Sequence, residues 1–259
     1  MLRRLITGLA VAAALGGCGA PAPAPNLPSS PSATAVAGAR CRGAAEKGGQ
    51  PVMFGPGRDL AGLTFGTATG SDAVGIVFAH EANDSACSWM RTAAAFAERG
   101  YRTLIFDFAG FGASRQHAAT YDADVAAAAD YLRSQGIARI VLIGASMGGT
   151  AVIIAAGAIT PAVTGVVALS PPVAFGPMGA LGTKLPDGLP VLLMAGKLDG
   201  QFPADARSLL ASIGPADNRS LRVVDSSLHG FRLVAVDGSA PQESKTALDE
   251  FLSNIAASS

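Results

Sequence analysis

The sequence is poor in charge, in aromatic side chains, and in cysteine and histidine. Of its 259 residues, 15% are charged and 6% are aromatic, and it has three histidines and three cysteines. Its 19 basic side chains balance its 19 acidic ones, so the chain has no net charge to attract the phosphates of a nucleic acid. The histidines and cysteines are scattered and do not form a metal-ligand set. We therefore expect no nucleic acid partner, no metal and no cofactor.

Long hydrophobic runs are also missing. The only segment that resembles a membrane anchor is residues 5–15, about half of the roughly 20 residues that a membrane-spanning helix needs. Yet 49% of all residues are hydrophobic, which is too many for a disordered chain. These features favour a folded domain with a buried core over an integral membrane protein.

The N-terminus has the features of an export signal. A pair of arginines precedes the apolar residues 5–15, and small residues then lead to Cys18. The sequence Leu15-Gly16-Gly17-Cys18 resembles the lipobox of bacterial lipoproteins. That resemblance implies that residues 1–17 are a signal peptide, that Cys18 is lipidated after cleavage, and that the protein is exported and lipid-anchored at the bacterial cell envelope. An ordinary secretory peptide or a twin-arginine signal is the alternative, and either would also export the chain.

The composition then changes twice. Residues 18–40 are rich in Ala, Pro and Ser, which favours an extended tether over a packed core. Residues 41–259 are enough for one well-buried domain. With Cys18 assigned to the lipid, Cys41 and Cys87 remain as an even pair in an oxidising compartment, and we predict a disulfide between them.

The domain alternates short apolar runs with longer segments of helical character. The apolar runs are continuous and rich in β-branched residues, which predicts strands buried on both faces. They cover residues 73–79, 102–106, 137–143, 163–169, 191–195 and 221–224. The predicted helices cover residues 85–99, 118–135, 147–158, 204–212 and 242–256. This pattern indicates an α/β fold with a mostly parallel central sheet and helices on both faces, and residues 51–54 and 63–69 add an antiparallel edge.

One motif carries most of the functional signal. The predicted strand 137–143 runs into Gly144-Ala145-Ser146-Met147-Gly148, and a predicted helix follows. A Gly-x-Ser-x-Gly sequence between a strand and a helix is typical of a nucleophile elbow, a strained turn that exposes the serine hydroxyl. The two glycines let the strand and the helix pass closely, and the helix N-terminus favours negative charge. Ser146 is therefore the candidate nucleophile.

A serine hydroxyl needs a base that takes its proton. His229 comes just after a predicted strand, where a loop can place its imidazole over the end of the sheet. His80 and His117 are the alternatives. We expect His80 instead to orient the loop in which it lies.

The base in turn needs a carboxylate that orients it. Asp199 comes just after another predicted strand and is the candidate acid. Asp225 is the alternative, because it also follows a strand and precedes His229 by four residues. The chain order Ser146, Asp199, His229 is the order of the catalytic triad in α/β-hydrolases.

These motifs together resemble the α/β-hydrolase fold over about residues 63–255, and within it the small lidless members that include dienelactone-hydrolase-like esterases. The resemblance also rests on His80-Glu81-Ala82 after a strand and on the turn-rich residues 107–114, where Asp107 is expected to bind local amides. It implies an oxyanion hole formed by the backbone N–H groups of Met147 and of Ala82, or of Glu81.

The chain departs from that family at two points. Glu81 stands where the family usually has a glycine, which leaves open the amide that faces the oxyanion. Dienelactone hydrolases proper use a cysteine nucleophile, whereas this elbow contains Ser146, which favours ordinary ester chemistry.

The expected substrate site is open and shallow. Residues 170–190, between two predicted strands, are too few for the helical cap that encloses the ligand in many members of this fold. The candidate pocket residues are His80, Ser170, Phe175 and Phe202.

The sequence thus predicts a serine hydrolase that cleaves a small carboxylic ester through an acyl-enzyme and is held at a membrane through Cys18. Acyl transfer or peptide hydrolysis would use the same triad and the same first half-reaction. A non-catalytic binding lipoprotein of the cell envelope that has kept the fold is the alternative from another class.

Overall fold

A computed structural model describes residues 41–214 and 217–258. The predicted signal peptide (1–17), Cys18 and the predicted tether (18–40) lie outside the described residues. In the part of the chain that is described, no helix has both the length and the apolar character needed to cross a membrane.

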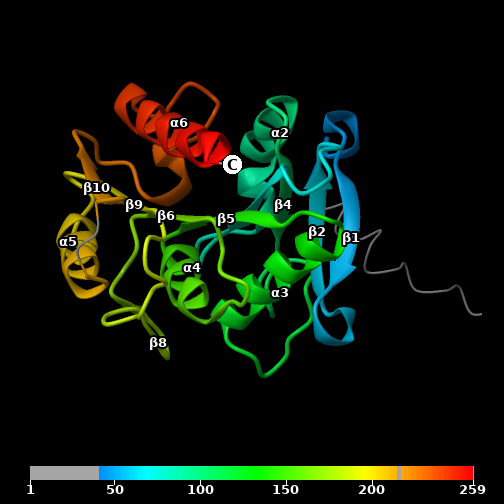
Figure 1. The fold of residues 1–259 in the computed structure, drawn as a ribbon, viewed down its shortest axis with the longest axis horizontal. Helices are drawn as coiled ribbons and strands as arrows, with labels where there is room; N and C mark the ends of the chain where they lie inside the picture. Colours follow the sequence, from blue (N-terminus) through cyan, green and yellow to red (C-terminus); the bar gives the residue numbers. More distant parts are fainter. Residues whose placement is uncertain (1–40, 215–216, 259) are drawn as a thin grey trace, which may run out of the picture. The chain divides into compact units, whose positions relative to one another are not determined.

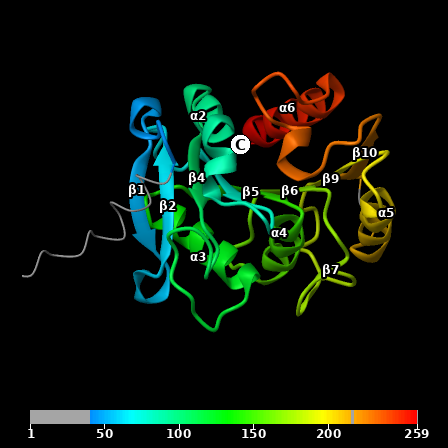
Figure 2. The same cartoon turned by 180° about the vertical axis from the view of Figure 1, so that it is seen from behind.

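An eight-stranded sheet forms the centre of the domain (Figure 1). Its strands lie in the order β1-β2-β4-β3-β5-β6-β9-β10, so that β1 and β10 form opposite edges, as the reverse view also shows (Figure 2). β1 and β2, and β2 and β4, pair antiparallel, and all other neighbours pair in parallel. The strands are β1 (Gln50–Phe54), β2 (Leu60–Phe65), β3 (Val74–Ala79), β4 (Arg102–Phe106), β5 (Arg139–Ala145), β6 (Gly165–Leu169), β9 (Val191–Gly196) and β10 (Arg219–Val224). The predicted parallel sheet with an antiparallel edge is confirmed, although β2 begins three residues earlier than predicted.

Helices cover both faces of the sheet. In Figure 1, α2 and α6 lie above the sheet, and α3 and α4 lie below it. α5 packs beside β9 and β10. The helices are α2 (Met90–Glu98), α3 (Tyr121–Ser134), α4 (Met147–Ala158), α5 (Phe202–Ser212) and α6 (Gln242–Ala257), with short 3-10 turns η1 (Ala45–Lys47), η2 (Pro56–Arg58), η3 (Ala86–Trp89) and η4 (Gly230–Leu233).

The sheet separates two hydrophobic layers. Successive side chains of a strand point to opposite faces, so Val77 of β3 packs in the layer of α3 and α4, while Phe78 packs in the layer of α2 and α6. Both side chains are fully buried. This burial on two faces explains why the central strands are continuously apolar in sequence. It also holds the strands in place, and with them the starting points of the loops that follow the strand ends.

The connection between β6 and β9 contains no helix. In this fully described segment the only regular structure is the hairpin of β7 (Ala174–Phe175) and β8 (Met178–Gly179). The prediction that the domain has no cap is therefore confirmed.

The predicted disulfide is present between Cys41 and Cys87. Cys41 is the first described residue and is buried, and Cys87 belongs to η3, which follows the loop after β3. The bridge therefore fixes the start of the domain to the segment that follows the loop after β3.

Removing this disulfide should destabilise the domain. The bridge closes a loop with a sequence separation of 46 residues. Loop-closure entropy then predicts a loss of about 4 kcal/mol of unfolding free energy for the Cys41→Ser, Cys87→Ser double variant. Urea unfolding of the oxidised wild type and the variant measures the difference, and equal unfolding free energies would contradict the prediction.

Candidate active site

Ser146 lies in the turn between β5 and α4. Its backbone has φ 49° and ψ −117°, a conformation that residues other than glycine rarely adopt. The neighbouring residues Ala145 and Met147 are buried, whereas Ser146 is partly exposed. Because α4 begins at Met147, the free N–H groups of the helix N-terminus lie beside the serine.

Two glycines make this turn sterically feasible. A Cβ atom on Gly144 would lie 2.8 Å from the backbone nitrogen of Gly149 and would collide with the carbonyl of Gly148. A Cβ atom on Gly148 would lie 2.7 Å from the carbonyl oxygen of His80. The Gly-x-Ser-x-Gly spacing is thus needed because the start of α4 packs against both β5 and the loop after β3.

Asp199 and His229 form a hydrogen-bonded pair. The imidazole Nδ1 of His229 lies 3.0 Å from Oδ1 and 2.9 Å from Oδ2 of Asp199. The carboxylate is nearly buried, and the imidazole is about one-third exposed. Asp225, the alternative acid, is exposed, and none of the contacts among the described residues joins it to His229. The structure therefore pairs His229 with Asp199.

The turn that carries Asp199 is bound to the chain that leads to His229. The backbone N–H groups of Lys197 and Leu198 donate to the carbonyls of Val224 and Ser226, at 2.7 and 2.9 Å. A Cβ atom on Gly196 would lie 2.7 Å from the Ser226 carbonyl oxygen, so only glycine allows this close approach. The distance between acid and base is therefore set by backbone contacts at the ends of β9 and β10.

Further contacts join this pair to the serine turn. The Ser146 N–H donates to the carbonyl of Leu169, at the end of β6, over 2.8 Å. A Cβ atom on Gly230 would lie 3.4 Å from the Cβ of Ala145, so the residue after His229 packs against the residue before Ser146. The candidate nucleophile, acid and base therefore follow the carboxyl ends of β5, β9 and β10 and lie at the same edge of the sheet.

The two aromatic pocket candidates, Phe175 and Phe202, are both half-buried. The rings of Phe202 and His229 are 4.3 Å apart between centroids, so Phe202 forms part of the wall beside the base. Phe175, in the β7–β8 hairpin, is half-buried and packs against the layer that contains α4.

Ser170 does not line an open pocket, which corrects the prediction. Its side chain is fully buried. The hydroxyl donates to Oδ2 of Asp199 over 2.6 Å and accepts the N–H of Gly230 over 3.1 Å. A residue at the end of a parallel strand can point into the site or into the interior, and here it points into the interior.

His80 is also buried, so its prediction as a pocket residue is wrong. Its Nε2 accepts the N–H of Phe108 over 3.1 Å, which leaves the proton on Nδ1 to donate to the Glu81 carbonyl over 2.8 Å. An Nε2 atom that accepts a hydrogen bond requires a neutral ring, and burial lowers the pKa of His80 in the same sense. Because both ring nitrogens are occupied, His80 is a brace for the loop after β3 and is not available as a base for Ser146.

Asp107 also holds the loop after β3. Its Oδ1 accepts the N–H of Ala86 and its Oδ2 accepts the N–H of Ala113, each over 2.8 Å. The expectation that Asp107 binds local amides is met. The loop that contains Glu81 and Ala82 is thus held at one end by His80 and at the other by Asp107.

The candidate oxyanion donors have no competing acceptors. In the described ranges, neither the N–H of Met147 nor that of Ala82 donates to another residue. Glu81 turns its side chain toward the base: its Oε2 occupies the space that a Cβ on Gly230 would need. Burial raises the pKa of Glu81, while the charges of His229 and Arg232 oppose that rise. The Oε2 atom is buried without a hydrogen-bond partner among the described residues.

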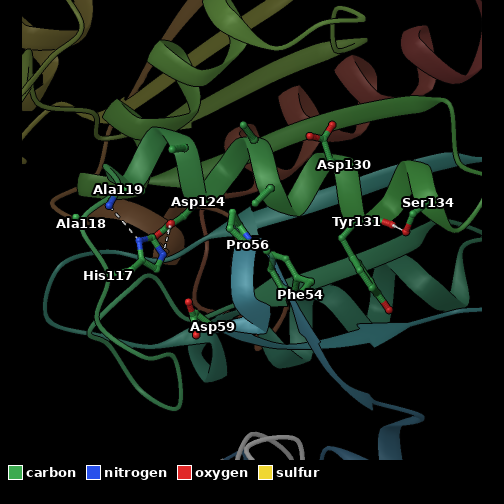
Figure 3. A pocket seen from close by; sticks show the side chains of 14 residues that line it. Phe54, Pro56, Asp59, His117, Ala118, Ala119, Asp124, Asp130, Tyr131 and Ser134 are labelled. Carbon is green, nitrogen blue, oxygen red and sulfur yellow. Dashed lines mark hydrogen bonds and ion pairs between the residues drawn. The ribbon is translucent and has the colours of Figure 1, made fainter.

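His117 belongs to a different part of the molecule. It lines a cavity of about 710 Å³ between α3 and the β1–η2 turn, together with Phe54 and Tyr131 (Figure 3). Its Nδ1 accepts the N–H of Ala119, and its Nε2 lies 3.0 Å from Oδ1 of Asp124. None of the predicted catalytic residues lines this cavity, so His117 is not placed to serve Ser146.

Two residues that the sequence reasoning did not single out shape the site. At Gly196, backbone carbonyls of the chain after β10 leave no room for a Cβ, and at Gly230 the carboxylate of Glu81 occupies the position of a Cβ. Gly230 also has φ 58°, which favours glycine. Their only signal in the sequence is their closeness to Asp199 and His229.

Known proteins share this fold. A family model described as alpha/beta hydrolase fold matches residues 76–255. An esterase from Pyrococcus furiosus is 21% identical with a TM-score of 0.62, covering 80% of this chain and 90% of that one. A predicted CIB-like hydrolase from Thermoplasma acidophilum is 23% identical with a TM-score of 0.61, covering 80% and 98%.

A third similar structure comes from Xanthomonas campestris and is described as an α/β serine hydrolase without lid. It is 19% identical with a TM-score of 0.54, covering 68% of this chain and 83% of that one. No curated protein matches the chain. Because the family model covers well over half of the residues and the sheet order and serine turn agree with it, the chain belongs to the alpha/beta hydrolase fold family.

Proposed function

We propose that the protein is a serine hydrolase that cleaves carboxylic esters through an acyl-enzyme. The observation that carries the proposal is the hydrogen-bonded pair of Asp199 and His229 beside the strained turn of Ser146. Membership of the alpha/beta hydrolase fold family supports hydrolytic chemistry, and the similar structures include an esterase.

In the first half-reaction, the Ser146 Oγ attacks the ester carbonyl carbon while Nε2 of His229 takes the hydroxyl proton. Asp199 keeps the other nitrogen, Nδ1, protonated and stabilises the imidazolium that forms. The N–H groups of Met147 and Ala82 bind the developing oxyanion. The alcohol leaves with the proton from His229, which produces the acyl-enzyme.

In the second half-reaction, His229 takes a proton from water, and the resulting hydroxide attacks the acyl carbon. The same two amides stabilise the second tetrahedral intermediate. Collapse of that intermediate releases the acid and returns the proton to Ser146. No group beyond the residues named and water is needed to balance the reaction.

The substrate class follows from the walls of the site. The short β6–β9 connection leaves the site without a cap, and the ring of Phe202 beside His229 offers an apolar surface. An apolar wall beside the base favours esters whose acyl or alcohol group is uncharged over polyanionic substrates.

Replacing the nucleophile should abolish turnover. We expect Ser146→Ala to lower kcat for a short-chain p-nitrophenyl ester by at least about 1,000-fold, because the acyl-enzyme cannot form. Ser208→Ala, on the exposed side of α5, is the matched control and should keep wild-type kcat. Thermal unfolding verifies that both variants fold, and ester turnover by folded Ser146→Ala at the wild-type rate would contradict the proposal.

We also propose that the mature protein is anchored in a membrane through a lipid on Cys18. The pattern of residues 15–18 supports the anchor, and the Cys41–Cys87 disulfide fits an oxidising compartment outside the cytosol.

The anchor can be tested in a bacterial host by detergent phase partitioning. Wild-type protein should enter the detergent phase, and Cys18→Ser should enter the aqueous phase because it lacks the thiol that takes the lipid. Mass spectrometry of the mature wild-type N-terminal peptide should show lipidated Cys18. An unmodified Cys18, or a mature chain that begins elsewhere, would contradict this part of the proposal.

A further inference from the structure

Ser170 follows β6 directly and has an unusual backbone. Its φ is 46°, a value that costs energy for any residue with a Cβ, and Pro171 follows it. Its N–H donates to the carbonyl of Met194 over 2.7 Å, so the strand pairing with β9 continues through this residue. A strained and fully buried serine at a strand end calls for a compensating interaction.

The hydroxyl of Ser170 supplies that interaction in a fixed direction. An N–H group can only donate and a carboxylate can only accept. The hydroxyl must therefore accept from Gly230 N–H, at 3.1 Å, and donate its single proton to Asp199 Oδ2, at 2.6 Å. The short donor–acceptor distance to the carboxylate is typical of a charge-assisted hydrogen bond.

These contacts close a ring. Ser170 binds Asp199, Asp199 binds Nδ1 of His229, and the peptide chain runs from His229 to Gly230, whose N–H returns to Ser170. One hydroxyl thus fixes both the carboxylate and the backbone that carries the imidazole. Rotation of the carboxylate or displacement of the turn would break at least one bond of the ring.

Other charged groups also face the base. Glu81 reaches the turn from the loop after β3, and Arg232 lies on η4, which follows His229. Asp84 contributes a further negative charge near Glu81. These groups remain in place when Ser170 is changed, so a change at Ser170 isolates the contribution of its hydroxyl.

We propose that Ser170 is a positioning residue for catalysis. Its hydroxyl holds the Asp199 carboxylate at a fixed distance from the backbone that carries His229, and it orients the carboxylate toward the imidazole. This inference rests on the proposed function. It adds a fourth group to Ser146, His229 and Asp199, one that does not touch the substrate.

Three variants separate the hydroxyl from the strained backbone. Ser170→Ala removes the hydroxyl and keeps the strain, and Ser170→Gly removes the hydroxyl and relieves the strain at φ 46°. Ser170→Cys keeps a weak donor and acceptor. Thr150→Val is the matched control, because Thr150 is fully buried and its hydroxyl also makes one short hydrogen bond, to the Pro172 carbonyl over 2.7 Å.

We expect kcat for a p-nitrophenyl ester to fall by about 10- to 100-fold in both Ser170→Ala and Ser170→Gly, with little change in KM. Ser170→Gly should unfold at a higher temperature than Ser170→Ala, so activity and stability should separate. Ser170→Cys should recover part of kcat, and Thr150→Val should lose stability without loss of kcat.

The pH dependence of kcat/KM distinguishes a positioning role from a purely structural one, because loss of structural support alone would not shift its acidic limb. Loss of the hydroxyl donor leaves more negative charge on the Asp199 carboxylate, which favours the imidazolium form of the pair. The acidic limb of kcat/KM should therefore move to higher pH in Ser170→Ala and Ser170→Gly. Wild-type kcat in these variants, a kcat loss that follows the unfolding temperature, or an unshifted acidic limb would overturn the proposal.

A proton NMR measurement keeps this test independent of the proposed function. The Nδ1–H of His229 bound to Asp199 should give a far-downfield resonance that Ser170→Ala shifts and Thr150→Val does not. If the wild type proved unable to hydrolyse esters, the proposed function would fail while this resonance still tested the ring. An identical resonance in Ser170→Ala would overturn the positioning role itself.

Discussion

The close crossing of α4 over the ends of β3 and β5 is the constraint on which the rest of the site depends. There is no room for a Cβ at Gly144 or Gly148, and the chain between them is forced through Ser146 at φ 49°. The same crossing places the carbonyl of His80 against the start of α4. One steric requirement therefore exposes the serine, places the helix N-terminus beside it, and brings the loop with the second candidate oxyanion donor into place.

The acid and the base depend on a second set of backbone contacts. Gly196 lets the chain after β10 cross the turn after β9, and hydrogen bonds between these segments hold Asp199 and His229 together. Polar side chains then fix what the backbone leaves free, since Ser170 holds the carboxylate and neutral His80 holds the loop after β3. Strand ends thus supply the position of each group, and buried hydrogen bonds supply its orientation.

Much of the fold and of the candidate site could be predicted from the sequence. The features that could not be predicted share one cause. Strand β9 was predicted to within one residue because strands buried on both faces must be continuously apolar. The serine turn follows from a local motif. Asp199 was predicted as the acid with Asp225 as the alternative, because both follow strands, and only the path of the chain across Gly196 shows that Asp199 pairs with His229. Ser170 was predicted to face the pocket, because a pattern of residue types does not define where a side chain points at a strand end.

The proposed catalysis requires Ser146 to be an activated nucleophile in the folded protein. Incubation of the native protein with a fluorophosphonate probe, followed by proteolysis and mass spectrometry, tests this most directly, because the probe reacts with activated serines before any substrate is known. We expect one adduct, on Ser146, that is absent when the protein is unfolded before exposure. No adduct on the folded protein, or an adduct on another serine with Ser146 unmodified, would contradict it.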